Sequence, residues 1–527
     1  MSEFRDVVVV GAGPTGLALA IALRQYGIDV VVVEKEARGK REARAGVVWQ
    51  RALEVLRDLG CAEAFLAEGL ALRRVEVVAE GREVGGIDLG AGETAYPRPL
   101  SIEQDAVERL LGERLREVGG EVRWSTEAVG VRTSDDGAVV EVRGADGLGT
   151  SLRCRWVVGC EGSHSVVRKA LGIPFEGARR PNLQCVQINA EADWKHPYAP
   201  DRSYFFLVRG ASLGVSPRPG GGYRFFCFSA DPDPTIDHAP TVEEMRALVA
   251  DAAHDPGTTL VPTDPPWANR ARFQDRFAGS LRVGRALLAG DSAHLWAPIG
   301  GHGLNTGLRG AHNLGWKLAA VHRGWAVDAL LDTYATEQRL TARKVMREMR
   351  HDVLELPPTR LTLLGMRLAG PHLMRGEWFA GRIRTVLSDL AMHHRESRLS
   401  QGGQDDQSNN RSRYGSLRAG DRLPDLPVLL DGRRCRLHEL LSYERWTLLT
   451  APGARGAPFD EARLRRLTDG YAMPVEHVRP YPARSARRRL AGAGSLILVR
   501  PDRHIGISTD TVEGLEAYLR RWFTRRG

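Results

Sequence analysis

Residues 6–34 read DVVVVGAGPTGLALAIALRQYGIDVVVVE, and this stretch decides the fold of the amino-terminal part of the chain. A run of valines ends at Gly11, a helical apolar pattern follows, and a second run of valines ends at Glu34. Runs that are apolar on both faces are typical of parallel strands buried between helices. The stretch therefore predicts an α/β fold that begins with a β-α-β unit: strand 5–10, helix 14–26 and strand 28–33.

The loop between the first predicted strand and its helix has the sequence GAGPTG. A turn this tight requires glycine, and the free N–H groups at the start of a helix bind pyrophosphate. A carboxylate at the end of the second strand accepts hydrogen bonds from ribose hydroxyls and repels a 2′-phosphate. We therefore predict a dinucleotide site here, rather than a tight βα turn with a surface acid. Its residues are Gly11, Gly13, Pro14, Thr15, Gly16, Glu34 and Lys35.

A second glycine-rich stretch, GDSAHLWAPIGGHGLNTG, spans residues 290–307. Asp291 follows a predicted buried strand at 281–289, and ligands bind at the carboxyl ends of parallel strands. Residues 300–305 lead into a predicted helix at 304–322, whose first N–H groups and positive dipole end favour a group that becomes negative. Two such helix starts suit the two ends of one dinucleotide whose far ring accepts electrons. This arrangement favours FAD.

The composition excludes several classes of protein. The 527 residues predict two or three domains, and 43% hydrophobic residues with a net charge of +9 are typical of a globular protein. The chain has no run of eighteen apolar residues, so we predict no membrane helix, and the amino terminus resembles a strand rather than a signal peptide. Arginines are spread along the chain, which argues against nucleic-acid binding. Six cysteines without CxxC or metal-ligand spacing predict reduced thiols, no metal site and a cytoplasmic location.

The pattern along the chain predicts several domains. Residues 75–100 and 183–230 alternate between apolar and polar residues and contain turn signals, which predicts antiparallel strands. The polar stretch 395–415 predicts a flexible linker, and a smaller domain follows it. We predict an FAD-binding domain over 1–182, with 75–100 contributing to the substrate domain; a substrate-binding β-sheet domain over 183–275; a return to the FAD-binding domain with helices over 276–394; the linker; and a last domain over 416–527.

Three separated motifs resemble those of the FAD-dependent aromatic hydroxylases, the group A flavoprotein monooxygenases typified by p-hydroxybenzoate hydroxylase. GAGPTG with Glu34 resembles their dinucleotide fingerprint. GCEGSHSVVR at 159–168 resembles their middle motif, in which aspartate is usual at the position of Glu161. GDSAH at 290–294 with PIGGHGLN at 298–305 resembles their flavin motif. The resemblance covers about residues 1–395 and implies a Rossmann-like FAD-binding domain with an inserted, mostly antiparallel β-sheet domain and a helical segment.

Residues 416–527 resemble the thioredoxin-like domain that larger members of this family carry at the carboxyl terminus. This domain lacks a CxxC motif, so we expect it to be redox-inert. The resemblance implies that it has a structural role or forms the contact of a homodimer.

The resemblance also implies roles for individual residues. Arg44 corresponds to an arginine that contacts the pyrophosphate, Gln104 to a glutamine near the ribityl chain, and Pro298 to a proline against the reacting face of the flavin. Asp291 would hold the ribityl chain. Gly301, Gly303, Leu304 and Asn305 would complete the cofactor site, with the backbone amides of residues 303–305 stabilising the reduced flavin.

The predicted catalytic residues are Arg44, Pro298 and His302. His302 stands where many family members have another residue, and we weigh two interpretations: a histidine that affects the pH dependence of the site, or a loop histidine that faces solvent. Predicted substrate contacts are Trp49, Phe206, Phe225 and Trp296, although isolated aromatic residues are more often part of the core.

The resemblance implies that NADPH or NADH reduces the FAD, and that O₂ then forms a C4a-hydroperoxyflavin that hydroxylates an aromatic substrate. No arginine stands out as an anchor for the carboxylate of a small benzoate, so we expect a polycyclic or polyketide-type phenol. Two alternatives are Baeyer–Villiger-type oxygenation on the same scaffold and a non-catalytic FAD- or NAD-binding protein.

Overall fold

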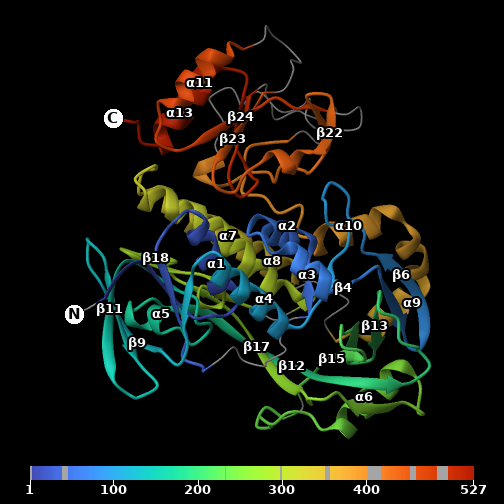
Figure 1. The fold of residues 1–527 in the computed structure, drawn as a ribbon. Helices are drawn as coiled ribbons and strands as arrows, with labels where there is room; N and C mark the ends of the chain where they lie inside the picture. Colours follow the sequence, from blue (N-terminus) through green and yellow to red (C-terminus); the bar gives the residue numbers. More distant parts are fainter. Residues whose placement is uncertain are drawn as a thin grey trace.

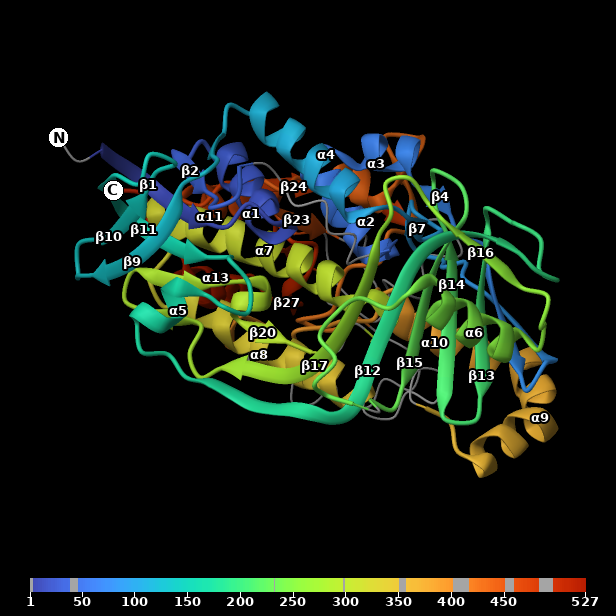
Figure 2. The ribbon, with the colours of Figure 1, turned by 90° about the horizontal axis from the view of Figure 1, so that it is seen from below.

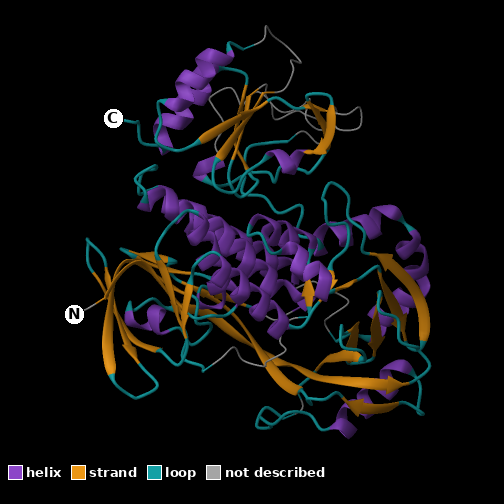
Figure 3. Ribbon diagram, viewed as in Figure 1, coloured by secondary structure: helices purple, strands orange, loops and turns teal. Residues whose placement is uncertain are grey.

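The computed structural model describes residues 3–37, 46–231, 233–296, 299–349, 357–400, 417–450, 459–482 and 496–527. A layer of helices lies between the carboxy-terminal domain and the larger sheets, as Figure 1 and Figure 3 show. None of the helices in the described ranges is long and apolar enough to cross a membrane.

The amino-terminal sheet is built on the predicted β-α-β unit. Strand β1 (Glu3–Val10) pairs in parallel with β2 (Val30–Val33) and β11 (Gly149–Gly159), and helix α1 (Pro14–Gln25) connects the first two. The valines of both strands are buried, so the prediction from the valine runs is confirmed. The other strands of this sheet are β8 (Glu121–Arg123), β9 (Glu127–Thr133), β10 (Ala138–Arg143), β18 (Arg282–Val283) and β19 (Ala286–Leu288).

The prediction of a single buried strand at 281–289 is wrong in one respect. The segment is a hairpin in which β18 pairs antiparallel with β19, and only β19 pairs in parallel with β11. Gly284 makes the turn with φ 55°, a backbone conformation that glycine adopts without steric strain.

A second, larger sheet holds nine strands. Its long members are β12 (Phe175–Asp193) and β17 (Ala268–Ala278), which pair with each other and run from the first sheet into the second (Figure 2). Strand β12 crosses the domain boundary predicted at 182, and β17 crosses the one predicted at 275. The remaining strands are β5 (Arg74–Ala79), β6 (Arg82–Asp88), β13 (Arg202–Val208), β14 (Ala211–Pro217), β15 (Tyr223–Ser229), β16 (Thr259–Pro262) and β20 (His294–Leu295).

Helices cover this second sheet on both faces. Helix α6 (Val242–Ala253), which Thr241 caps, packs on one face. Helices α9 (Arg360–Arg375) and α10 (Glu377–Leu387) pack against β5 and β6. The last two helices of the segment 276–394, predicted as a return to the FAD-binding domain with helices, therefore bury their apolar side chains against the second sheet.

The central helical layer contains the long helices α7 (His302–His322) and α8 (Leu330–Met349). Helix α7 packs along α1, and both contribute to one apolar core with the valines of β1 and β2. Shorter elements surround them: β3 (Val47–Val48), α2 (Gln50–Asp58), α3 (Ala62–Glu68), β4 (Leu70–Ala71), β7 (Leu100–Ser101), α4 (Gln104–Glu117) and α5 (Val166–Ala170).

The carboxy-terminal domain has a four-stranded sheet in the order β24 (Val475–Val478), β23 (Trp446–Thr450), β26 (Leu496–Val499) and β27 (Ile505–Thr509). Helices α11 (Glu461–Asp469) and α13 (Val512–Trp522) pack on it. Its core is continuous with that of the first domain, because Trp446 meets Trp316 of α7 edge to face with ring centroids 5.5 Å apart. A small three-stranded antiparallel sheet completes the domain, in the order β22 (Arg433–Arg436), β21 (Pro427–Leu430) and β25 (Tyr481–Pro482).

The predicted flexible linker begins too early. Residues 398–400 form a short 3₁₀ turn in which Leu399 is fully buried, and the Ser397 hydroxyl donates to Glu337 of α8. Packing against α8 and the carboxy-terminal domain orders this segment despite its polar composition. The rest of the predicted linker, from residue 401 on, lies outside the described residues.

Candidate functional site

The first glycine loop (residues 11–16) leaves the start of α1 open. Gly13 is the N-cap residue with an extended backbone (φ −69°, ψ 174°), and none of the described side chains caps this helix. A Cβ atom added at Gly13 would meet no atom within 4 Å. At the end of β2, the Glu34 carboxylate accepts hydrogen bonds from the backbone N–H groups of Ala12 (2.8 Å) and Glu36 (3.1 Å). The predicted phosphate-binding and ribose-binding groups therefore lie beside each other.

The second glycine loop (residues 300–305) leads directly into α7. Gly300 (φ 69°) and Gly301 (φ 65°) adopt left-handed backbone conformations that strain other residues. These two residues turn the chain so that the helix begins at His302, two residues before the predicted start. An added Cβ at Gly303 would meet nothing within 4 Å. Both glycine loops thus present backbone to open space at a helix N-terminus, as a ligand-binding loop requires.

The side chain of Asn305 holds the second glycine loop in place. Asn305 is fully buried; its Oδ1 accepts from the backbone N–H of Trp49 (2.8 Å), and its Nδ2 donates to the carbonyls of Val47 (2.9 Å) and Gly301 (2.7 Å). The sequence predicted a role only for the backbone amide of Asn305. The structure adds a side-chain role, which is to fix the loop against β3.

Thr15 joins the first glycine loop to the segments on either side of the second glycine loop. Its side chain lies in α1 against Gly290 and Gly307, so that a Cβ added at Gly290 would come within 2.7 Å of the Thr15 Oγ1. Gly290 precedes Asp291, and Gly307 lies in the first turns of α7. Two segments far apart in the sequence are thus in contact, which is the arrangement predicted for the two ends of one dinucleotide site.

The middle motif supports the same region. The Glu161 carboxylate accepts hydrogen bonds from the Val167 N–H (2.8 Å) and from the hydroxyls of Ser165 (2.8 Å) and Ser292 (3.2 Å). Burial raises the pKa of the Glu161 carboxyl, although these hydrogen bonds act in the opposite direction. The glutamate therefore joins its own loop to the Gly-Asp motif through Ser292, a residue that the sequence did not single out.

His302 is buried, so the interpretation as a solvent-facing loop histidine is wrong. Its ring stacks on Trp49 with centroids 6.3 Å apart, and its Nδ1 lies 3.4 Å from the Asp389 Oδ1. The Trp49 indole N–H donates to the Gly300 carbonyl (2.8 Å), and Arg309 lies 3.5 Å from the other oxygen of Asp389. Burial alone would raise the pKa of Asp389, but the charges of Arg309 and His302 lower it.

The remaining predicted cofactor residues differ in position. Asp291 is exposed in a 3₁₀ turn after β19, and Lys35 is exposed after β2. Gln104 begins α4 and donates to the Glu108 carboxylate (2.9 Å). The predicted residues Arg44 and Pro298 lie outside the described residues.

The predicted substrate contacts Phe206 and Phe225 lie in the core. Both side chains are fully buried in the apolar cluster between α6 and the face of the nine-stranded sheet that α6 covers. Phe226 lies on the opposite face, where it packs with the cluster that contains Trp296. Side chains alternate between the two faces of a strand, and only the position of α6 decides which face is covered. We therefore correct the prediction for Phe206 and Phe225, whereas Trp296 remains a candidate.

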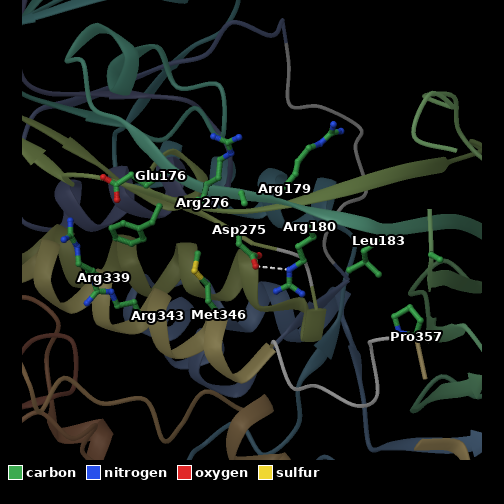
Figure 4. A pocket seen from close by; sticks show the side chains of 14 residues that line it. Glu176, Arg179, Arg180, Leu183, Asp275, Arg276, Arg339, Arg343, Met346 and Pro357 are labelled. Atoms are coloured by element: carbon green, nitrogen blue, oxygen red, sulfur yellow. Dashed lines mark hydrogen bonds and ion pairs between the residues drawn. The ribbon is translucent and has the colours of Figure 1, made fainter. Parts of the chain in front are cut away.

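A cavity of about 960 Å³ lies between β12, β17 and the end of α8 (Figure 4). Phe277 of β17 lines this cavity and pairs with His294 of β20, whose ring stacks on it with centroids 6.3 Å apart. Leu183 and Met346 also line it and pack in the same cluster as Trp296. The cavity therefore adjoins the strand that leads into the second glycine loop.

Comparisons with known proteins agree with this geometry. A family model described as an FAD binding domain matches residues 5–349, and one described as the C-terminal domain of aromatic-ring hydroxylases matches residues 416–525. Rifampicin monooxygenase of Rhodococcus hoagii is 30% identical, over 99% of this chain and 98% of its own. The 12-dehydrotetracycline 5-monooxygenase/anhydrotetracycline 6-monooxygenase of Streptomyces rimosus subsp. rimosus is 31% identical, over 98% of each chain.

Solved structures show the same fold over the whole chain. Aklavinone-11 hydroxylase, in a ternary complex with FAD and aklavinone, superposes with a TM-score of 0.78 at 26% identity and 99% coverage of both chains. The anhydrotetracycline hydroxylase OxyS from Streptomyces rimosus superposes with a TM-score of 0.77 at 29% identity, again with 99% of both chains covered.

The chain therefore belongs to the FAD-dependent aromatic hydroxylases. It is a flavoprotein monooxygenase with a Rossmann-like FAD-binding domain, an inserted antiparallel sheet domain and a carboxy-terminal thioredoxin-like domain. The residues present fit FAD, because two open helix N-termini, at Gly13 and Gly303, are held together through Thr15 with Glu34 beside the first of them.

Proposed function

We propose that this enzyme uses NADPH or NADH to hydroxylate a polycyclic or polyketide-type phenol that binds in the cavity beside β20. The volume of about 960 Å³ carries this proposal. It lies at the upper end of the range of about 300–1,000 Å³ that is usual for small-molecule sites, and a single aromatic ring would fill little of it. Relatives whose names refer to anhydrotetracycline, and a neighbour solved with aklavinone, support a substrate of several fused rings.

In this proposal the protein binds and orients the cofactor. The backbone of the first glycine loop binds the pyrophosphate, Glu34 the adenosine ribose, and Asp291 the ribityl chain. The backbone amides of residues 303–305 would stabilise the negative charge that the flavin gains on reduction. Bound FAD, once reduced, supplies the electrons that activate O₂ and delivers one oxygen atom to the substrate.

Other residues shape the reaction site. Asn305 and Trp49 keep the second glycine loop fixed through the hydrogen bonds described above. The apolar wall that includes Phe277 and Met346 excludes water from the substrate, which strengthens electrostatic interactions in the site. The roles that the family resemblance implies for Arg44 and Pro298, contact with the pyrophosphate and with the reacting face of the flavin, stay predictions.

A panel of phenols with one to four fused rings tests the substrate class. We expect compounds with three or more rings to accelerate anaerobic reduction of the bound flavin by NADH or NADPH, because only these fill the cavity. Fastest reduction with a single-ring phenol would contradict the proposal. The carbon skeleton of the product separates hydroxylation from Baeyer–Villiger-type insertion, since only the latter breaks a carbon–carbon bond.

The variant Asp291→Ala tests the cofactor site. We expect purified D291A to contain less FAD than the wild type and to turn over more slowly. Asp136→Ala is the matched control, because Asp136 is an exposed loop aspartate away from both glycine loops. Full flavin content and full turnover in D291A would show that the site is assigned wrongly.

A further inference from the structure

His302 and Asp389 form a buried contact that the proposed function does not explain. His302 is the first residue of α7 and directly precedes residues 303–305, whose amides we assign to the flavin. Its Nδ1 lies 3.4 Å from the Asp389 Oδ1, which is an ion-pair distance but longer than a usual hydrogen bond. A titratable ring and a carboxylate thus lie together at the start of the helix that the cofactor meets.

The ring of His302 lies between Trp49 and the second glycine loop. One face stacks on the Trp49 indole with an interplanar angle of 22°. A Cβ atom added at Gly300 would come within 2.9 Å of the His302 Nε2. The two ring nitrogens therefore have different surroundings: Nδ1 is next to Asp389, and Nε2 is next to the backbone of the second glycine loop.

The helix that precedes Asp389 does not require its carboxylate. Asp389 directly follows Ser388, the C-cap residue of α10, and adopts a left-handed φ of 57°. Glycine is usual at this position, and asparagine also occurs there. Asp389 is only 3% exposed, and its Oδ2 and the His302 Nδ1 have no hydrogen-bond partners among the described residues. Burying a carboxylate with incomplete pairing costs free energy, so its position opposite His302 indicates a role in the site.

Asp389 also interacts with two other cations. The Arg309 guanidinium of α7 lies 3.5 Å from the Asp389 Oδ2, and Lys344 of α8 is nearby. Burial acts to raise the pKa of the Asp389 carboxyl, but the charges of Arg309, His302 and Lys344 lower it, so Asp389 is ionised at neutral pH. Its negative charge favours a proton on His302, whereas the positive charge of Arg309 opposes one.

We infer that His302 takes up a proton at Nε2 when the bound flavin is reduced, and that Asp389 is the positioning residue that holds the Nδ1 edge of the ring. This inference rests on the proposed function, which places the flavin at the second glycine loop. The nicotinamide cofactor transfers two electrons and one proton to the flavin, which gains one negative charge. A second proton comes from solvent and converts the His302 imidazole into an imidazolium. The new positive charge compensates the new negative charge.

The test counts the protons that the holoenzyme binds on reduction. The midpoint potential of the bound FAD is measured against a reference dye from about pH 6 to about pH 9, a range that includes the usual titration of histidine. The slope of the potential against pH gives the number of protons taken up per two electrons, without substrate or O₂. We expect the wild type to take up more protons than His302→Gln, by up to about one proton near neutral pH.

Two further variants should move this uptake in opposite directions. Asp389→Asn keeps a residue that tolerates the left-handed backbone but removes the negative charge, so uptake should move about one pH unit lower. Arg309→Gln removes the opposing cation, so uptake should move to higher pH. His322→Gln is the matched control, because His322 ends the same helix with Asp6 3.5 Å away. H322Q should take up as many protons as the wild type does.

Several results would overturn the inference. Equal proton numbers in the wild type and H302Q at every pH would show that His302 does not bind the second proton. Shifts of D389N and R309Q in the same direction would show a general change of the loop rather than a charge effect. If H302Q does not retain FAD, opposite shifts in D389N and R309Q support the inference in its place. The proposed function fails separately, when no phenol accelerates flavin reduction in a wild type that still takes up the second proton.

Discussion

The contact between the first domain and the thioredoxin-like domain contains a buried ionic cluster centred on Arg500. Its guanidinium donates to both oxygens of Glu337 in α8 (2.9 and 3.0 Å) and to both oxygens of Asp502 (2.9 and 2.6 Å). Lys317 of α7 also donates to Glu337 (2.7 Å), and all four side chains are essentially inaccessible to solvent. The cluster therefore contains two cations and two anions.

Replacing Arg500 with methionine leaves one buried carboxylate uncompensated. Removal of one partner from a buried ion pair typically destabilises a protein by about 3–5 kcal/mol. We expect the lower end of this range for R500M, because Lys317 still pairs with Glu337, and Asp502 keeps the donors Asn313 (2.8 Å) and Trp316 (3.0 Å). A loss of about 3 kcal/mol lowers the urea midpoint by about 1 M when the slope is about 3 kcal/mol per M, and by less when a larger protein gives a steeper slope.

Urea unfolding at neutral pH, followed by tryptophan fluorescence, measures this effect, since Trp316 and Trp446 meet at the domain contact. Arg463→Met is the control. It breaks an exposed ion pair with Glu513 in the same domain and should change stability by less than about 1 kcal/mol. The double variant Arg500→Met/Asp502→Asn restores equal numbers of buried cations and anions, so it should be more stable than R500M. A double variant less stable than R500M, or an R500M variant as stable as R463M, would refute the charge argument.

Three further predictions concern the site and its surroundings. Gly13→Ala should leave the unfolding midpoint unchanged, because the added Cβ meets no atom within 4 Å, but it should weaken FAD binding at least about tenfold. Unchanged FAD affinity in this variant would show that the pyrophosphate does not bind at the first glycine loop. Asn305→Leu removes three buried hydrogen bonds and should destabilise the protein by about 2–4 kcal/mol with loss of FAD, and an unchanged melting temperature would contradict this. Burial lowers the pKa of His294 to about 4, so its contribution to stability is complete above about pH 6.5 and falls by about 3 kcal/mol as the pH drops to 4. His294→Phe should remove this part of the acid destabilisation, and identical pH profiles of stability for variant and wild type would rule it out.

Much of the cofactor site could be predicted because its signals are local. The valine runs, the glycines and Glu34 occupy one continuous stretch. The local structure that each of them favours depends only on residues a few positions away. Asp389 gave no such signal. It follows α10 far from His302 in the sequence, and only the packing of α10 against the second sheet brings the two side chains within 3.4 Å.

The substrate side of the site shows the same limit. The alternation of Phe225 and Phe226 predicts that one faces each side of the strand, but nothing in the sequence states which side α6 covers. Likewise, the spacing of Arg339 and Arg343 places them on one face of a helix, yet only the position of β12 and β17 makes that face the wall of a cavity.

The sequence by itself determined the β-α-β unit, the two glycine-rich helix starts and, through them, the chemistry of a flavin cofactor. Those features depend on which φ and ψ angles a glycine permits and on N–H groups that any helix leaves free. The tertiary structure alone decided which aromatic side chains are core, how His302 is surrounded and where Arg500 finds its partners. Burial and ion pairing depend on segments hundreds of residues apart, and their positions follow from the packing of the whole chain.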